Sequence, residues 1–440
     1  MVNNKPVESS HLLSHSKPQL KLNQPHRKSL QRPSSLLLSL LLILSSLYLY
    51  LISGTISSDE ECDNSTVSSY LGSYLSLFST SSSSDCEDYN RFVWNYDLPE
   101  SGWSTSLSRR VIAIGDLHGS LDQLRTLLKD IHYDSDSDTV ILIGDLMAKA
   151  PSIKSSLDTV SYCRSMNFTA VRGNHDQYVI RWRNWMELHR HRFINSSLSI
   201  NTSNPHPLDQ SFENDEWLKT QRPVRGLKLP NGLRWKDEHF EIARRLKISD
   251  HSWLLSLSLT IYSDFLKSFF VHAGLLPYNS AKDVSKDTRR SEQLILSLRE
   301  NRDPYTLIEM RNVRSGRRPT KRTDKGKPWY KIWNRTMNSI KQQQLAESGE
   351  AMSGILTVIY GHWAAKGLKL NDYTIGLDSG CVYGRQLSAL VINSSSSSSS
   401  SDLSQDDDED GRVDGSKGKK SRAKKLTVNG FDARIVQVSC

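Results

Sequence analysis

Three polar turns at equal spacing constrain the fold of this chain most strongly. Each follows a short apolar run: VIAIGDLHG presents Asp116 and His118, TVILIGD presents Asp145, and VRGNHD presents Asn174 and His175. Asp116, Asp145 and Asn174 follow one another at intervals of 29 residues, and leucines recur at helical spacing within 121–128. This order of strand and helix predicts an α/β fold with a parallel sheet, whose strands end at one ligand-binding edge.

Two later segments repeat the pattern of a strand followed by a histidine. FFVHAG places His272 and TVIYGHW places His362 after apolar, β-branched runs. One such piece alone is usually turn chemistry or a structural histidine, but five in order predict a divalent-metal site. The predicted ligands are Asp116, His118, Asp145, Asn174, His272 and His362. Carboxylate, amide and imidazole donors suit two ions of zinc, manganese, iron or cobalt, with Asp145 between them.

Composition limits the packed part of the 440-residue chain to one domain. Segments 1–35, 54–92 and 393–425 are rich in serine or blocks of charge and cannot bury enough apolar surface to fold alone. We predict a globular domain at 93–440, in which 393–425 is a low-complexity loop between the two strands of a hairpin. The net charge is +9, and the basic excess lies in this domain, which fits an acidic substrate or a nucleic acid as ligand. The composition excludes the collagen-like, coiled-coil and multi-span membrane classes.

An uncharged apolar run at 36–53 is long enough to cross a bilayer. Basic residues precede it and acidic residues follow it, so we expect a cytoplasmic tail at 1–35, a signal anchor at 36–53 and a luminal, serine-rich acidic stem at 54–92. A cleaved signal peptide is the alternative, disfavoured by the long polar leader. Several Asn-X-Ser/Thr sequences fit a luminal glycoprotein, and the odd number of cysteines leaves at least one thiol outside an internal disulfide.

The motifs together resemble a known superfamily. GDLHGSLDQL, GDLMAKAP, RGNHD, VHAG and YGHWA are similar, over 111–392, to the ordered motifs of the phosphoprotein-phosphatase superfamily of binuclear metallophosphoesterases. GKPWYKIWN and GLDSGCVYGRQLSALVI resemble its ApaH-like branch, and with the anchor the chain resembles the zinc-dependent endopolyphosphatases of fungal vacuoles. The resemblance implies a calcineurin-like α/β fold with sheets flanked by helices. It also implies two metals, zinc first, and a type II protein of the vacuole membrane that cleaves polyphosphate internally in the lumen by means of a metal-activated hydroxide.

The resemblance also implies roles for single residues. It assigns one metal to Asp116 and His118, a bridge to Asp145, and the second metal to Asn174, His272 and His362. His175 would be the catalytic proton donor, while Lys149 and Arg311, with Arg314 as a near alternative, would bind substrate phosphate. Ala148 stands where protein phosphatases have an aspartate that orients the donor. We therefore expect weaker general-acid help, which a phosphate leaving group tolerates better than an alkoxide does.

Other functions stay open at this level. Ser/Thr phosphoproteins, dinucleoside polyphosphates and RNA caps are alternative substrates, and a non-catalytic polyanion-binding module is disfavoured by the complete ligand set. The basic run at 311–331 is either a solvated or nucleic-acid-binding loop or a surface for a long polyanion. We expect no specific nucleic-acid partner, and no motif indicates the oligomeric state.

Overall fold

The computed structural model describes residues 92–99, 109–194, 229–278, 288–349, 355–393 and 426–440. These residues belong to a unit that spans Glu87–Cys440. The predicted tail, anchor and low-complexity insertion lie outside the described residues, so they stay predictions. Among the helices of the described ranges, none combines the length and the apolar character that a bilayer crossing needs.

The predicted parallel strands form one half of the first sheet. β2 (Arg110–Ile114), β3 (Asp138–Leu142) and β4 (Thr169–Ala170) pair in parallel and in sequence order. Their carboxyl ends therefore lie in a row along one edge, as the repeated spacing predicts.

A C-terminal hairpin completes this sheet. β13 (Gln386–Asn393) pairs antiparallel with β2 on one side and with β15 (Phe431–Ser439) on the other, and β14 (Thr427–Val428) forms the outer edge. This arrangement confirms the prediction that the strands flanking the insertion belong to one hairpin.

The second sheet is assembled from segments that lie far apart in the sequence. In spatial order it contains β1 (Val93–Asp97), β5 (Ser258–Ser263), β6 (Ser268–Val271), β10 (Thr357–Tyr360), β12 (Thr374–Gly376) and β11 (Lys369–Leu370). β6 and β10 are parallel, with Val271 opposite Tyr360. The residues that follow these two strands therefore emerge side by side.

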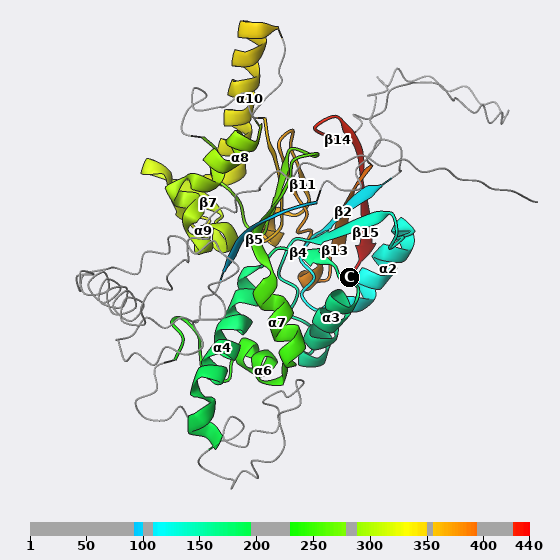
Figure 1. Cartoon of the computed structure of the whole chain (residues 1–440), viewed down its shortest axis with the longest axis vertical. Coiled ribbons are helices and arrows are strands. Elements are labelled where there is room, and N and C mark those ends of the chain that lie inside the picture. The colour runs from blue at the N-terminus through cyan, green and yellow to red at the C-terminus, as the bar shows by residue number, and fades with distance from the viewer. Residues whose placement is uncertain (1–91, 100–108, 195–228, 279–287, 350–354, 394–425) are drawn as a thin grey trace, which may run out of the picture. The chain divides into compact units, whose positions relative to one another are not determined.

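The alternation of side chains along the strands decides how the layers stack. On β2, Ile112 packs into the core under the first set of helices, while Val111 packs into the core between the sheets. On β6, Phe270 joins that central core and Phe269 packs under the second set of helices. The two sheets thus face each other, and helices cover both outer faces (Figure 1).

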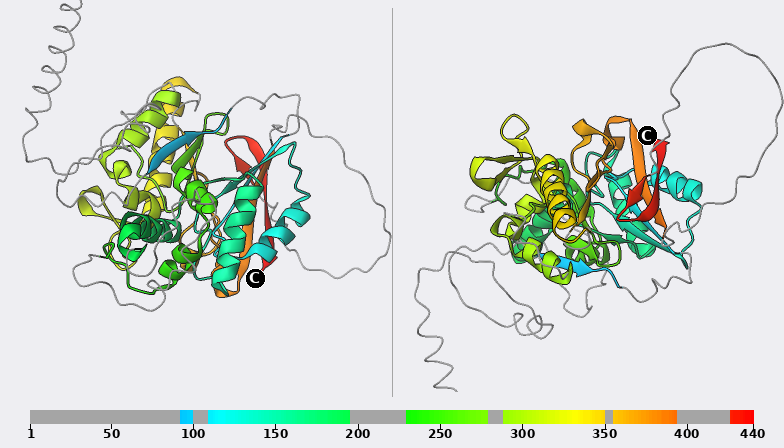
Figure 2. Two further views of the ribbon diagram at one scale, coloured as in Figure 1. Left: turned by 60° about the horizontal axis from the view of Figure 1, so that its bottom comes forward. Right: turned by 90° about the horizontal axis from the view of Figure 1, so that it is seen from above.

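Two sets of helices form the outer layers (Figures 1 and 2). The helices over the first sheet are α2 (Leu121–Ile131), α3 (Ile153–Ser165), α4 (Asn174–Ile194), α6 (Glu238–Arg245) and α7 (Ile248–Ser256). Over the second sheet lie α8 (Thr288–Ser297), α9 (Pro304–Glu309) and α10 (Trp329–Ser348). α2 buries Leu124, Leu127 and Leu128, which confirms the helix predicted from their spacing.

Within the described ranges, the remaining elements are a small separate sheet and four 3₁₀ turns. A small antiparallel sheet contains β7 (Asn312–Arg314), β8 (Arg318–Thr320) and β9 (Lys327–Pro328) and follows α9 in the chain. The 3₁₀ turns are η3 (Arg299–Arg302), η4 (Ser315–Arg317), η5 (Ala364–Lys366) and η6 (Cys381–Tyr383).

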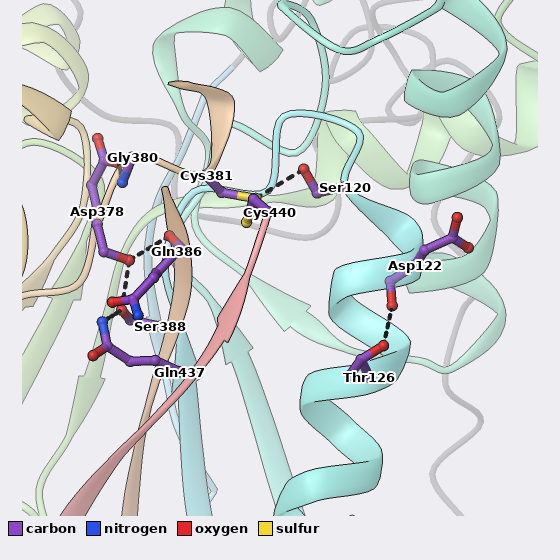
Figure 3. Close-up of a disulfide and its surroundings, with 11 residues drawn as sticks. Ser120, Asp122, Thr126, Asp378, Gly380, Cys381, Gln386, Ser388, Gln437 and Cys440 are labelled. Carbon is purple, nitrogen blue, oxygen red and sulfur yellow. Dashed lines mark hydrogen bonds between the residues drawn. A yellow bond between two sulfur atoms is a disulfide. The ribbon is translucent and has the colours of Figure 1, made fainter. Parts of the chain in front are cut away.

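A disulfide fixes the end of the chain. Cys381, in the crossing from the second sheet to the first, is bonded to Cys440, which follows β15 (Figure 3). The Cys381 sulfur lies 3.2 Å from the Ser120 hydroxyl oxygen, and the Cys440 N–H donates to the Arg385 carbonyl at 2.9 Å. Cys163 is buried with a free thiol, while the two stem cysteines lie outside the described residues.

Candidate metal centre

The six predicted ligands come together where strands of both sheets end. Asp116 and His118 follow β2, Asp145 follows β3, Asn174 opens α4 after β4, His272 follows β6, and His362 follows β10. All six side chains are buried. The sequence pattern of a strand followed by a polar residue therefore becomes one cluster in space.

Asp145 lies at the centre of this cluster. Its Oδ2 is 3.7 Å from His118 Nε2 and 3.4 Å from His272 Nε2. Two groups of donor atoms, each contained within 4.8 Å, could hold an ion: Asp116, His118 and Asp145, and Asp145, His272 and His362. Asp145 belongs to both groups, and Asn174 Oδ1 lies near the second, 3.2 Å from His272 Nε2. A carboxylate shared by two such groups could contribute to the binding of an ion in each.

Backbone carbonyls orient two of the imidazoles. His118 Nδ1 lies 3.0 Å from the Ala148 carbonyl, and His272 Nδ1 lies 2.7 Å from the Ile143 carbonyl. A carbonyl can only accept, so each Nδ1 carries the hydrogen and each Nε2 lone pair is left for a metal.

His362 uses the opposite ring nitrogen. Its Nε2 lies 3.2 Å from the Glu309 carbonyl, and its Nδ1 lies 3.2 Å from His272 Nε2, inside the cluster. The backbone N–H of His362 donates to both Asp116 oxygens, at 3.0 and 3.1 Å. Neighbouring backbone groups thus orient ligands from both sheets.

The electrostatics of the buried acids fit a site for cations. Burial raises the pKa of Asp116, and the charge of Asp378 raises it further. Burial alone would raise the pKa of Asp145, but the charge of His272 outweighs it and lowers that pKa well below its ordinary value. Burial alone would lower the pKa of His272, but Asp145 raises it to about 10. Carboxylates removed from water need a positive partner, and divalent ions would supply that charge here.

The loops of the site adopt an uncommon backbone conformation. Five residues other than glycine have φ values between 45° and 68°: His118, Asp145, Ala148, Lys149 and His362. Such residues cost of order 1–3 kcal/mol each and persist where their surroundings fix them. The buried Asp176 carboxylate contributes by accepting the N–H groups of Gly173, Asp145 and Leu146 at 2.8–2.9 Å. It thereby joins the loops that follow β3 and β4.

The predicted phosphate-binding residues lie beside the ligands. Lys149 and Arg311 line the same pocket, of about 150 Å³. Arg314, the alternative to Arg311, is exposed on β7 and does not line this pocket. Thr323 and Tyr383 also line the pocket, and the Tyr383 side chain is 65% exposed.

The predicted proton donor has a partner that we did not expect. His175 Nδ1 lies 2.8 Å from Nε2 of His239, on α6. The alanine at 148 leaves His175 without the aspartate of the protein phosphatases, but an imidazole from another helix lies beside it. No motif or spacing in the sequence marks His239.

Asp378 is a second pocket residue outside the predicted set. It is buried, lines the pocket, and accepts the Gly380 N–H at 3.1 Å. Burial raises its pKa. Asp378 follows β12 within the segment GLDSG, so the same pattern of a strand followed by an acid would have found it.

Several known proteins are similar to this chain. Residues 109–366 match the family model described as Calcineurin-like phosphoesterase. The symmetrical bis(5'-nucleosyl)-tetraphosphatase of Yersinia enterocolitica is 27% identical over 292 residues, covering 63% of this chain and 86% of the relative. That of Serratia proteamaculans is 28% identical over 293 residues, covering 63% and 89%. Among solved structures, a putative diadenosine tetraphosphatase has a TM-score of 0.39 at 23% identity and covers 68% of this chain and 94% of that one.

Proposed function

The chain belongs to the calcineurin-like phosphoesterase family and is a metallophosphoesterase, and we propose that the bonds it hydrolyses are phosphoanhydrides. The observation that supports this most directly is the pair of donor groups sharing Asp145, in one pocket with Lys149 and Arg311. Divalent ions held there would supply an activated water and positive charge for the phosphoryl oxygens. Zinc is our first assignment because imidazoles make up half of the ligands, and cobalt, manganese or iron would also suit them.

The remaining side chains of the pocket have separate tasks. Lys149 and Arg311 bind phosphate oxygens and orient the substrate. His175 donates a proton to the leaving oxygen. A phosphate leaving group has a second pKa near 6, so a phosphoanhydride needs less of this help than a phosphoserine ester does.

A basic surface next to the pocket favours inorganic polyphosphate. The segment 311–328, here called the basic hairpin, reaches the pocket through Arg311 and Thr323. Its exposed cations are Arg314, Arg318, Lys321, Arg322, Lys325 and Lys327. Lys321 pairs with Glu309 at 3.2 Å and Arg322 with Asp324 at 2.7 Å, so the hairpin keeps an excess of positive charge. A long polyanion could lie along this surface and be cleaved internally.

A dinucleoside polyphosphate is the second candidate. Two relatives bear the name of symmetrical bis(5'-nucleosyl)-tetraphosphatases. The exposed ring of Tyr383 at the pocket could stack on a nucleobase, a contact that inorganic polyphosphate does not offer.

One substrate panel tests both candidates. The purified chain, supplied with zinc, cobalt, manganese or magnesium, would be given long-chain polyphosphate, diadenosine tetraphosphate, capped RNA and a phosphopeptide. Polyphosphate cut into intermediate lengths on a gel supports internal cleavage, whereas loss of single phosphates from otherwise intact chains contradicts it. Preference for the phosphopeptide would overturn the anhydride assignment.

Two variants separate the candidates. Combined Arg318→Ala and Lys325→Ala substitutions should weaken polyphosphate cleavage and spare the dinucleotide, while Tyr383→Ala should do the reverse. The location in the vacuole lumen depends on the predicted anchor at 36–53. Protease protection of isolated vacuoles, with and without detergent, would test it.

A further inference from the structure

His175 uses one ring nitrogen within the protein and leaves the other to the pocket. Its Nδ1 lies 2.8 Å from His239 Nε2, and the two rings are nearly parallel, at 18°, with centroids 5.1 Å apart. His175 lines the pocket of the metal ligands, so its Nε2 is the atom available to a substrate. The Tyr178 ring meets both imidazoles edge-on, at 5.8 and 5.3 Å. Tyr178 thus packs against both imidazoles and restricts how they can turn.

The start of α6 in turn holds His239. Asp237 caps this helix, and its Oδ1 accepts the Phe240 N–H at 2.9 Å and the Trp182 indole N–H at 3.1 Å. Trp182 is fully buried in α4, the helix that begins with Asn174 and His175. One carboxylate therefore joins the helix that presents His239 to the helix that presents His175.

Asp237 also biases the tautomer of His239. Its Oδ1 lies 4.0 Å from His239 Nδ1, too far for a hydrogen bond but close enough for its negative charge to favour a hydrogen on that nitrogen. A neutral imidazole with its hydrogen on Nδ1 has a bare Nε2 that can only accept. That acceptor faces His175 Nδ1.

We propose that His239 is a positioning residue for the proton donor, an inference that rests on the proposed function. As an imidazolium, which carries a hydrogen on both ring nitrogens, His175 donates its Nδ1–H to His239 Nε2. This bond fixes the imidazole plane and turns Nε2–H toward the leaving oxygen. As water forms the new P–O bond and the old P–O bond breaks, the Nε2 proton passes to the leaving oxygen. The proton released by the attacking water balances the one that His175 gives up, and the Nδ1–H stays bonded to His239 throughout.

Leaving-group dependence distinguishes this role from simple packing. We would compare wild type with His239→Ala, His239→Gln, His175→Ala and the double variant on phenyl phosphate, which has a poor leaving group, and 4-nitrophenyl phosphate, which has a good one. General-acid catalysis contributes about 10²–10⁴-fold, so loss of its positioning should lower kcat on phenyl phosphate by about 10–100-fold with KM almost unchanged. The loss on 4-nitrophenyl phosphate should be within about 3-fold, because that leaving group needs little protonation.

Three comparisons complete the test. His239→Gln should recover most of the rate, since its amide can accept the same hydrogen bond. Removing His239 from the His175→Ala protein should change nothing further. His251→Gln is the matched control, because His251 is another buried histidine on the same helical layer but lies outside the pocket. Equal losses on both substrates, or additive losses in the double variant, would overturn the proposal.

A spectroscopic measurement tests the hydrogen bond independently of turnover. In ¹⁵N-resolved NMR spectra, wild type should show a protonated His175 Nδ1 whose signal shifts or exchanges away in His239→Ala. An unchanged signal would contradict the proposal even if no aryl phosphate were cleaved. Failure of the proposed function is distinct: it would appear as a chain that cleaves aryl phosphates but neither polyphosphate nor diadenosine tetraphosphate.

Discussion

The two sheets build the metal centre in different ways. The first sheet contributes four predicted ligands after consecutive parallel strands, so a regular spacing in the sequence becomes a row of side chains in space: Asp116, His118, Asp145 and Asn174. The second contributes His272 and His362, which lie 90 residues apart in the chain and meet because β6 pairs with β10. Four of the six predicted ligands thus follow from local repetition, and the other two depend on long-range pairing.

Asp145 is the residue at which these two sets of ligands meet. Asp145→Asn should lose both ions and lower kcat by at least about 10³-fold, because the residue belongs to both donor groups. His118→Ala and His362→Ala should each lose about one ion. Elemental analysis of metal per chain, with hydrolysis rates, would check this.

The matched control for these variants is Asp122→Asn, which removes a carboxylate that is 91% exposed on α2. It should keep both ions and full activity. Two ions per chain in Asp145→Asn would show that the sheets hold their metals independently.

The disulfide between Cys381 and Cys440 holds the segment that runs from the second sheet to the first. Breaking this disulfide should have the next largest effect. Cys440→Ser opens a disulfide that spans 59 residues and should lower the free energy of unfolding by about 2–4 kcal/mol. Chemical denaturation with and without reductant measures the change. Reductant should destabilise wild type to the same extent and leave the variant unchanged. A variant as stable as oxidised wild type would show that strand pairing alone holds the crossing.

We expect a buried histidine in the helical layer over the first sheet, His251, to make the free energy of unfolding sensitive to acid. His251 is buried on α7, with Nε2 2.9 Å from the Asn184 side-chain oxygen. Burial, followed by the charges of Arg183 and Arg172, lowers the pKa of His251 from 6.5 to about 3. The unfolded chain therefore takes up a proton as the pH falls below 6.5, while the folded chain does not. The stability contributed by the neutral imidazole is complete above pH 6.5 and is lost as the pH falls toward 3.

Between pH 6.5 and 5 this loss amounts to about 2 kcal/mol. In His251→Gln, which cannot titrate, the difference between the free energies of unfolding at pH 7 and pH 5 should shrink by that amount. Denaturation curves at the two pH values provide the measurement. An unchanged difference would place the acid-sensitive group elsewhere.

The sequence contained enough to predict the strand at 111–114, the strand before Asp145, the helix after 120 and the clustering of the six proposed ligands, because each of these six residues lies within a few positions of the end of an apolar run. Asp378 carries the same signal, because it follows β12 within two residues. His239 could not be predicted, since its helix follows a long intervening segment and it meets His175 only because α6 packs on α4. The pairing of Cys381 with Cys440 could not be predicted either, because five cysteines allow several partners.

The sequence by itself determined which side chains could hold metals, since a residue directly after a buried strand must lie at an edge of its sheet. Only the tertiary structure decided how those edges meet: that Asp145 lies within reach of His118 and His272, that Arg311 rather than Arg314 reaches the pocket, and that His239 lies beside His175. The physical reason is that strand-end positions follow from local periodicity, whereas contacts between distant elements depend on how whole layers pack.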